Sequence, residues 1–410
     1  MYDCIIIGAG PAGMMAAAAA SNLGKSVVLI EKNKMAGRKL RITGKGRCNV
    51  TNIADSQSLM RNINENGRFL FSALSAFDSA DTMSFFEGLG VPLKTERGGR
   101  VFPKSDKAVD VADAMYKKVL DSGCEFISGE VSEVLTENGC ISGVRLKSGK
   151  EISAKSVIIA TGGLSYPLTG STGDGYRMAK TLGHSVTPPR AALVPIETNE
   201  YWPAEMQGLS LKNVKLTLKC ENKLLFSDQG EMLFTHFGIS GPLVLSASCH
   251  IKDKDIQQCV AVIDLKPALT EEVLYKRICT DFEKLHSKKA SNCLDLLLPK
   301  SMIEVMLKEW GIDTEKTTNQ ITKEERMALV KLLKGFKIPL NSKYKLDIAV
   351  ITSGGVATKE LNPATMESKI KKDLYFIGEV IDTDAYTGGY NLQIAFSTAY
   401  ACAESIIELA

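Results

Sequence analysis

The chain has 410 residues, more than one hydrophobic core usually serves, so two or three domains are expected. Apolar residues make up 44% of the sequence and charged residues 24%, values typical of globular proteins. The net charge of +3 is too small to indicate a nucleic-acid or membrane partner, and we expect neither.

The cysteine pattern and the N-terminus exclude several protein classes. No apolar run reaches the roughly 18 residues of a membrane span, and no positively charged segment precedes the apolar start as it would in a secretory signal. Ten cysteines are scattered without a C-x-x-C pair, and with four histidines they form no zinc pattern. We therefore expect a reduced, cytoplasmic protein without a metal site, and not a flavin disulfide reductase.

The chain begins with a pattern typical of a dinucleotide-binding βαβ unit. Residues 3–7 form an apolar stretch that predicts a strand covered on both faces. A turn with G-x-G-x-x-G spacing follows, then an alanine-rich helix over residues 12–23 and a second strand over residues 26–30. Glu31 ends that strand, 18 residues after the last glycine of the turn. The combination predicts a nucleotide site, where the turn alone would be weak evidence.

Each glycine of this turn has its own steric role. Gly8 makes the tight turn, Gly10 lets a pyrophosphate approach the backbone, and Gly13 lets helix and strand pack closely. The helix start offers free N–H groups to the phosphates, and Glu31 is placed to accept hydrogen bonds from the ribose. An opening so near the N-terminus favours resident FAD over NAD. The predicted cofactor contacts here are Gly8, Gly10, Pro11, Ala12, Gly13 and Glu31.

A loop rich in glycine and cations, residues 32–52, follows the second strand. Its position predicts that it lies across the pyrophosphate and reaches the flavin ring; the alternative is a solvated surface loop. Cys48 is the one residue that could act as a redox partner of the flavin, and the alternative is a cysteine packed near the ring. The predicted cofactor contacts of the loop are Lys32, Arg38, Lys39, Gly46, Arg47, Cys48 and Asn49.

A resemblance to a known family becomes specific in this loop. The glycine turn, Gly37-Arg38-Lys39 and the segment T-G-K-G-R-C-N-x-T-N at residues 43–52 together resemble the BaiN-like family of FAD-dependent oxidoreductases. Members of that family are described as aminoacetone oxidases and as bile-acid (3-dehydro-4,6-diene) reductases. The resemblance extends through the whole chain, and it implies that backbone groups near Val131 contact the adenine.

The next cofactor signature lies after a stretch of ordinary elements. Residues 72–89 have the apolar spacing of one amphipathic helix, and residues 125–134 are predicted to form a strand. A β-branched strand over residues 156–159 then ends in Ala-Thr-Gly-Gly, small residues that would not collide with a nucleotide at the sheet edge. The predicted cofactor contacts of this signature are Ala160, Thr161 and Gly162.

The middle of the chain has a different pattern of apolar and polar residues. Short alternating strands predict an inserted β-barrel-like domain over residues 191–267 and 336–349, and helix signals predict a helical subdomain over residues 268–335. The FAD-binding domain is then discontinuous, residues 1–190 and 350–410. His236 lies in a segment that resembles a family motif. It is either a proton donor to the substrate or a packed histidine that holds a turn.

The third cofactor signature lies near the C-terminus. A strand over residues 374–377 ends at Gly378, and Asp382 is placed to bond a ribityl hydroxyl. A glycine-rich turn then leads into the final helix, whose N-terminus should stabilise negative charge at the pyrimidine edge of the reduced flavin. The predicted cofactor contacts of this signature are Gly378, Glu379, Asp382, Asn391, Leu392 and Gln393.

The sequence thus predicts an α/β protein whose Rossmann-like FAD-binding domain, of glutathione-reductase type, carries an inserted β-barrel-like domain and a helical subdomain. Three distant segments should converge on one FAD at the carboxyl edge of the sheet. Since no second G-x-G-x-x-G occurs, NADH or NADPH would dock only transiently.

Three functions remain open for this fold. The first is NAD(P)H-dependent reduction of a conjugated, steroid- or bile-acid-like enone through flavin N5. The second is oxidation of a small amine such as aminoacetone with O2, and the third is non-catalytic flavin binding for docking or sensing. A small-molecule substrate is expected in the first two, and the sequence does not indicate an oligomeric state.

Overall fold

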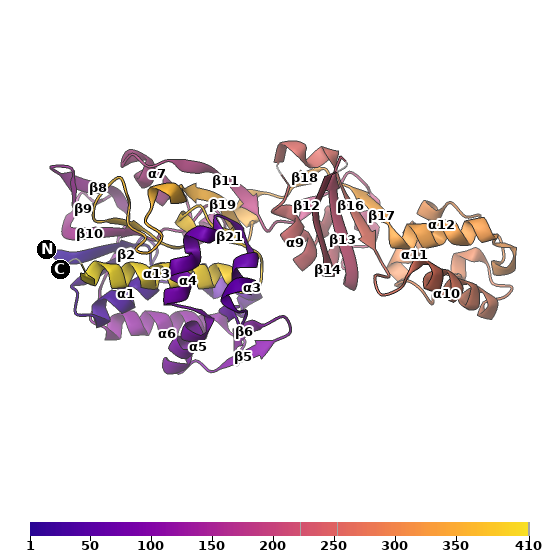
Figure 1. The fold of residues 1–410 in the computed structure, drawn as a ribbon, viewed down its shortest axis with the longest axis horizontal. Coiled ribbons are helices and arrows are strands. Elements are labelled where there is room, and N and C mark those ends of the chain that lie inside the picture. The colour runs from indigo at the N-terminus through magenta and orange to yellow at the C-terminus, as the bar shows by residue number, and fades with distance from the viewer. Residues whose placement is uncertain (222, 252, 409–410) are drawn as a thin grey trace. The chain divides into compact units, whose positions relative to one another are not determined.

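The structure, a computed structural model, describes residues 1–221, 223–251 and 253–408. The chain divides into two compact units (Figure 1), residues 1–192 with 346–410 and residues 193–345. None of the helices that the described residues form combines the length and apolar character that a membrane crossing needs.

The first unit is built on a sheet whose central strands are parallel. Its parallel strands lie in the order β7-β2-β1-β10-β20, and β10 continues into an antiparallel meander with β9 and β8. The strand predicted over residues 3–7 is β1, and the apolar residues 4–7 are buried as expected of a strand covered on both faces. The strands of this sheet are β1 (Tyr2–Ile7), β2 (Val27–Glu31), β7 (Glu125–Ser128), β8 (Val131–Glu137), β9 (Cys140–Leu146), β10 (Glu151–Ile159) and β20 (Leu374–Phe376).

Three helices pack together in this unit, with α1 (Pro11–Asn22) in contact with both α6 (Ala108–Asp121) and α13 (Tyr390–Glu408) (Figure 1). The alanine-rich sequence of α1 explains the arrangement, because small side chains let neighbouring helices approach closely. Seven alanine and methionine residues of α1 are buried. The shorter helices are α2 (Thr43–Gly46), α3 (Ser56–Arg61), α4 (Phe71–Ala76), α5 (Ser79–Gly88) and α7 (Asp174–Thr181).

The single helix predicted over residues 72–89 is wrong. The segment forms α4 and α5, which are separated at Phe77 and Asp78. The Asp78 side chain accepts hydrogen bonds from the backbone N–H groups of Ala80 and Asp81, and Asp81 reciprocates in a capping box. A strong N-cap inside an amphipathic pattern therefore starts a new helix although the apolar spacing continues.

The smaller strands of the first unit form three further sheets. These sheets pair β3 (Thr51–Asn52) with the hairpin β5 (Leu93–Glu96) and β6 (Arg100–Pro103), β4 (Ile63–Glu65) with β21 (Asp384–Ala385), and β11 (Val186–Ala192) with β19 (Ile351–Val356).

The single strand predicted over residues 125–134 is interrupted. Its two parts are β7 and β8, which belong to opposite ends of the large sheet.

The second unit is a seven-stranded antiparallel sheet with helices, and both share one hydrophobic core. Trp202, Phe234 and Phe336 are buried in that core together with the apolar faces of the helices. The strands, in sheet order, are β17 (Phe336–Pro339), β16 (Cys259–Asp264), β13 (Ser210–Cys220), β14 (Lys223–Thr235), β15 (Gly238–Ser240), β12 (Ile196–Glu197) and β18 (Ser342–Lys343). The helices are α8 (Trp202–Glu205), α9 (Pro242–Ser248), α10 (Glu271–Lys284), α11 (Lys300–Trp310) and α12 (Lys323–Lys334).

Both units are mixed structures of helices and sheets, and the first has the Rossmann-type arrangement, so the predicted fold class is confirmed. In the predicted helical region, the Thr270 and Thr322 side chains each cap the helix that follows, as expected of threonine at a helix start. The limits of the cofactor domain and of the inserted domains remain a proposal. The shared core joins the sheet and the helices of the second unit into one body.

Candidate functional site

The three predicted cofactor segments meet at the carboxyl ends of adjacent strands. β1, β10 and β20 are neighbours in the sheet and run parallel. Beyond the strands, Ala160 donates its N–H to the carbonyl of Ile7 at 2.9 Å, and Ile377 donates to that of Ile159 at 3.1 Å. Segments that are 370 positions apart in the sequence, at Ile7 and Ile377, therefore form one edge, where open α/β sheets bind their ligands.

Two glycines of the first turn are required by close backbone packing. A Cβ on Gly13 would lie 1.9 Å from the Gly8 carbonyl oxygen, and a Cβ on Gly8 would lie 2.7 Å from that of Ala160. Gly8 also has a φ of +103°, which only glycine adopts at little cost. A Cβ on Gly10 would meet no atom within 4 Å. The turn is thus closed by two glycines and leaves open space beside the third.

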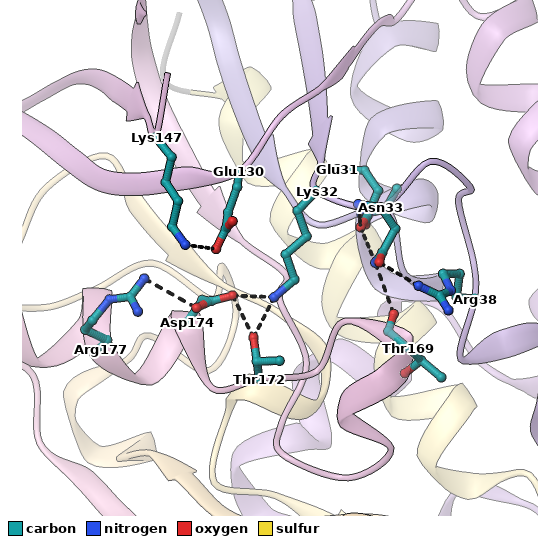
Figure 2. Close-up of polar contacts among 11 residues, drawn as sticks. Glu31, Lys32, Asn33, Arg38, Glu130, Lys147, Thr169, Thr172, Asp174 and Arg177 are labelled. Atoms are coloured by element: carbon teal, nitrogen blue, oxygen red, sulfur yellow. Dashed lines mark hydrogen bonds and ion pairs between the residues drawn. The ribbon is translucent and has the colours of Figure 1, made fainter. Parts of the chain in front are cut away.

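Glu31 is held firmly at the end of β2. Its Oε2 accepts the Ala9 N–H at 2.8 Å, and its Oε1 accepts the backbone N–H and the side-chain amide of Asn33 at 2.8 and 2.7 Å (Figure 2). The Glu31 carbonyl accepts the N–H of Gly129 at 2.9 Å. This bond brings the predicted adenine contact Val131, which is two residues further on, to the same strand end.

The cations next to Glu31 are paired with protein groups. Lys32 Nζ lies 2.5 Å from both Asp174 and Thr172, and Arg38 donates to Asn33 at 2.8 Å (Figure 2). Asn33 in turn donates to the Thr169 carbonyl at 3.1 Å. These contacts join residues 32–38 to the segment 169–174.

A second polar link joins the basic loop to the third cofactor segment. Lys39 Nζ lies 2.7 Å from Glu379 and 2.5 Å from Ser165 Oγ. The other oxygen of Glu379 accepts the N–H of Thr352 at 2.9 Å. A Cβ on Gly162 would lie 3.8 Å from the Glu379 carboxylate, so the second segment is also near. The basic loop and the regions of the second and third signatures therefore meet in one polar cluster, and no sequence signal pointed to Ser165 or Thr352 as members.

Arg47 is engaged by acids of the hairpin region and not free for a phosphate. Its guanidinium lies 2.5 Å from both Glu96 and Asp106, and it stacks on Phe102 at 4.2 Å. The hydrogen bonds to Glu96 and Asp106 raise the pKa of Arg47. The neighbouring Gly46 and Asn49 differ: Gly46 has a φ of +83° with open space beside it, and the buried Asn49 Oδ1 bonds to no described residue.

Cys48 is completely buried with a φ of +60°, in a tight turn closed by its N–H bond to the Thr43 carbonyl at 3.0 Å. Burial raises the pKa of the Cys48 thiol to about 12. The thiol therefore stays protonated at neutral pH, and only the thiolate is a good nucleophile. This geometry favours the packed cysteine over a redox partner.

The polar residues of the third segment mostly shape the segment itself. Thr187 donates to the Asp382 carboxylate at 2.7 Å, and burial raises the pKa of Asp382. The Asn391 side chain bonds both backbone groups of Ala385, at 3.0 and 2.8 Å. Gln393 is fully buried and accepts from Thr51 at 2.6 Å. Leu392, between them, is half-buried.

Close packing also fixes Gly378, where a Cβ would lie 2.9 Å from that of Ala12. Asp384 is a residue that the sequence analysis missed. It is 2% exposed, burial raises its pKa, and its Oδ2 has no hydrogen-bond partner within the described residues. The neighbouring buried hydroxyls of Thr383 and Ser353 also have no partner there. The sequence signal that could have identified Asp384 was its position two residues after the predicted cofactor contact Asp382.

The residues at this edge fit an FAD cofactor. Open space at Gly10 lies at the start of the 12-residue helix α1, whose first N–H groups have no intrahelical partner. No acidic side chain occupies the first turn of α1, so the phosphate charges would meet no repulsion there. The unpartnered Asn49 Oδ1 and Thr161 Oγ1 are the kind of buried polar atoms that a cofactor satisfies.

His236 lies in the second unit, in the turn between β14 and β15. Its side chain is exposed and lies edge-on to Phe237 at 5.0 Å between ring centroids. Phe237 stacks on Tyr344 at 4.4 Å. An exposed imidazole is not a packed core histidine, and its role as a proton donor stays a prediction. Within the described ranges, no three His, Cys, Asp or Glu side chains are grouped to hold a metal ion.

The comparisons with known proteins agree on the family. A family model described as "HI0933-like protein Rossmann domain" matches residues 2–405. Two proteins named "Ribosomal RNA dihydrouridine synthase" are similar over almost the whole chain. The one from Escherichia coli is 33% identical, covering 99% of this chain and 98% of its own. The one from Haemophilus influenzae is 35% identical, covering 98% of both chains.

A third relative has a different name. The "3-dehydro-bile acid delta(4,6)-reductase" of Clostridium scindens is 30% identical and covers 98% of both chains. Among solved structures, the 3-ketosteroid delta1-dehydrogenase of Sterolibacterium denitrificans has a TM-score of 0.53 at 13% identity, covering 100% of both chains. At that identity the likeness is one of fold alone.

Proposed function

The chain belongs to the HI0933-like Rossmann family of FAD-dependent oxidoreductases, and from this premise we propose that it reduces the C5=C6 bond of a uridine in ribosomal RNA to dihydrouridine. The observation that carries the proposal is the pair of relatives named for this activity, each matched over at least 98% of its own length. The expectation of no nucleic-acid partner is not kept, because net charge does not describe local surfaces.

The proposed chemistry is common to the named activities of the three relatives. The C5=C6 bond of uracil is conjugated to the C4 carbonyl, and the double bonds of a 3-oxo-4,6-diene are conjugated to the C3 carbonyl. In both reductions, hydride adds to a carbon of the conjugated system that is far from the carbonyl, and a proton adds to the carbon beside the carbonyl. The predicted enone reduction therefore stands as a reaction type, with the uracil ring as the enone.

Bound FAD would supply the hydride chemistry. Around it, α1 would bind the pyrophosphate at its N-terminus, and Glu31, fixed by Ala9 and Asn33, would accept hydrogen bonds from the ribose. The Lys39–Glu379 pair would hold the basic loop against the third segment. The first N–H groups of α13 would stabilise negative charge at the pyrimidine edge.

His236 is the proposed proton donor. It is exposed in a turn of the second unit, and histidine is the side chain that most often transfers protons in enzymes. His236→Gln keeps a polar side chain of similar size and removes the imidazole. We expect it to lower the rate of product formation by 10²-fold or more, the usual contribution of general acid catalysis. Flavin reduction by NADPH, which needs no proton from this residue, should be unchanged.

A steroid-like conjugated enone is the second candidate substrate. The specific observation in its favour is the bile-acid reductase relative at 30% identity over 98% of both chains. NADH or NADPH is the proposed electron source for either substrate, because the family chemistry is reductive. Neither cofactor has a dedicated glycine-rich site in the sequence.

The test uses the purified full chain under anaerobic conditions. The flavin is reduced with NADH or NADPH, and then unmodified ribosomal RNA, a steroid dienone or buffer is added. We expect the RNA to reoxidise the flavin and nucleoside mass spectrometry to find dihydrouridine. Reoxidation by the dienone alone would favour the second candidate. In a parallel sample with oxidised flavin, anaerobic bleaching by aminoacetone and reoxidation on admission of O2, without bleaching by NADH or NADPH, would contradict both and indicate an amine oxidase.

A further inference from the structure

We propose that the solvent-facing side of the β13–β16–β17 sheet in the second unit binds the phosphate backbone of the RNA substrate, through Lys215, Lys219 and Lys337. This inference rests on the proposed function, because it names the surface by which that substrate would be held. We call this surface the lysine face. It is defined by Lys215, Thr217, Lys219, Ser227, Gln229, Val260, Val262, Asp264 and Lys337.

Strand register places these side chains on one side of the sheet. Lys215 pairs with Gln229 and Asp264 on the neighbouring strands. Thr217 pairs with Val262, which in turn pairs with Lys337. Directly paired residues of adjacent strands point to the same face, and residues two apart along a strand do too. The labelled strands lie side by side in Figure 1.

The two sides of this sheet have opposite character. On one side Leu216, Leu218, Ile263, Ile338 and Phe336 are buried in the core of the unit. On the other side all three lysines of the lysine face are exposed. An antiparallel sheet with one solvated face is ordinary, and a solvated face usually carries charges of both signs.

Cations predominate on the lysine face. Of the carboxylates on this side of the sheet, Asp264 is neutralised by Lys334 at 2.6 Å, and Glu231, two residues beyond Gln229 on β14, accepts a hydrogen bond from the Ser210 hydroxyl at 2.7 Å. Lys215, Lys219 and Lys337 make no ion pair or hydrogen bond with any residue that the structure describes, although many other lysines of the chain are paired. Three unpaired cations around a neutralised acid make a local anion-binding surface that the net charge of the whole chain hides.

The spacing and chemistry suit a single nucleic-acid strand. Lys215 and Lys219 are four residues apart on β13, about 13 Å at the usual rise of a strand, and Lys337 lies two strands away from Thr217, about 10 Å. The face therefore spans about four steps of a stacked strand at roughly 3.4 Å each. Thr217, Ser227 and Gln229 add hydrogen-bond donors, which protein–RNA interfaces use on phosphate and sugar.

The face carries no aromatic side chain on which a base would stack. The apolar side chains on this side include the half-buried Val260 and Val262, which lie between the lysines, and the exposed Leu224 and Pro339, which pair with Lys219 and Val260. Contacts through lysine to phosphate hold a strand without reading its sequence. The lysine face would therefore give affinity and orientation, and the choice of the target uridine would be made elsewhere.

The experiment compares two triple variants of the full-length holoenzyme. K215Q/K219Q/K337Q removes the charges of the lysine face. K276Q/K284Q/K323Q removes three exposed lysines of α10 and α12 and changes the net charge equally. Binding of unmodified ribosomal RNA transcribed in vitro is measured against salt concentration. Circular dichroism and FAD absorbance confirm that each variant is folded and loaded.

We expect the lysine-face variant to bind RNA at least tenfold more weakly than the wild type. The slope of log affinity against log salt should become shallower by about 2, at roughly 0.7 per lost phosphate contact. The helix variant should stay within twofold of the wild type. Equal weakening in both variants, or wild-type affinity in the lysine-face variant, would overturn the proposal. If the lysine face binds an acidic protein and not RNA, the lysine-face variant would bind RNA with wild-type affinity.

Dihydrouridine formation by the wild-type protein tests the proposed function separately. If the wild type modifies ribosomal RNA but the lysine-face variant binds and modifies it normally, the docking surface is wrong and the proposed function stands. If the wild type neither binds nor modifies any ribosomal RNA, both fail. Reduction of a steroid dienone should be unchanged in the lysine-face variant, because a small uncharged substrate needs no phosphate contact.

Discussion

Both units of this protein have a hydrophobic core, and they differ in what else joins their segments. In the first, distant segments also meet through backbone close approach and partly buried polar links, as at Gly8, Gly13 and the Lys39–Glu379 pair. In the second, the apolar core joins a sheet and helices. Close approaches of this kind need particular residues, so the recognisable motifs are concentrated in the first unit. An apolar core can be filled by many combinations of apolar residues, so the second unit has fewer recognisable positions.

The largest expected effect separates two glycines of the same turn. Gly13→Ala places a Cβ 1.9 Å from a backbone oxygen, which cannot be relieved by a side-chain shift, so we expect little folded protein. Gly10→Ala meets no atom within 4 Å, so the chain should fold with near wild-type circular dichroism but lose FAD. Flavin absorbance per mole of folded protein is the measurement. A yellow Gly10→Ala protein with wild-type FAD affinity would contradict the pyrophosphate role.

A core truncation in the second unit should give the next largest effect. Phe336 is fully buried and packs against Trp202 at 4.9 Å. Phe336→Ala should cost about 3–5 kcal/mol of unfolding free energy, the usual range for such a cavity. Urea denaturation followed by tryptophan fluorescence measures it, and Leu224→Ala, at an exposed position of β14, is the control. FAD binding should survive in the folded fraction, and its loss would show that the two units do not behave separately.

The partly buried Lys39–Glu379 pair should matter less than the packing. Lys39→Met leaves the Glu379 carboxylate without its cation, and we expect a loss of about 1–3 kcal/mol together with weaker FAD retention. Lys155→Met removes the exposed partner of Asp3, where a loss of at most about 1 kcal/mol is expected. Thermal unfolding and FAD release on dilution are compared. Similar behaviour of the two variants would mean that the link does not organise the site.

The smallest effect is a pH dependence from His184. The His184 side chain is buried and shares a hydrogen bond with the Ser368 hydroxyl at 2.8 Å. Burial lowers the pKa of His184. Below its ordinary pKa of about 6.5 the unfolded chain binds a proton that the native state does not, so stability should fall as the pH falls from 7.5 to 5.5. His184→Gln should flatten that fall, and His286→Gln, at an exposed histidine, should not. The thermal unfolding temperatures of the wild type and both variants, measured at pH 7.5 and pH 5.5, test this prediction.

Much of the cofactor edge was predictable, because its constraints are local. The positions of Gly8 and Gly13 follow from steric rules for a turn between strand and helix, and the capping residues Thr270 and Thr322 follow from hydrogen-bond rules at helix starts. The break at Asp78 was missed although its signal was also local, since the apolar spacing outweighed the cap.

The partners of the charged loop were not predictable. Lys32, Lys39 and Arg47 were expected to face a cofactor, and each is paired with an acid from another part of the chain. A sequence shows which residues carry charge but not which opposite charges the fold brings within reach. The burial that keeps Cys48 protonated is likewise a property of the surrounding chain.

By itself the sequence determined the βαβ start, the three cofactor signatures and the family resemblance, because each depends on the order and spacing of residues close together in the chain. Only the tertiary structure decided which backbone bonds join the three predicted signatures into one edge, that Oδ2 of the buried Asp384 has no hydrogen-bond partner among the described residues, and that three lysines share an open sheet face. Those facts depend on strand order and register, which are set by the packing of distant segments against one another.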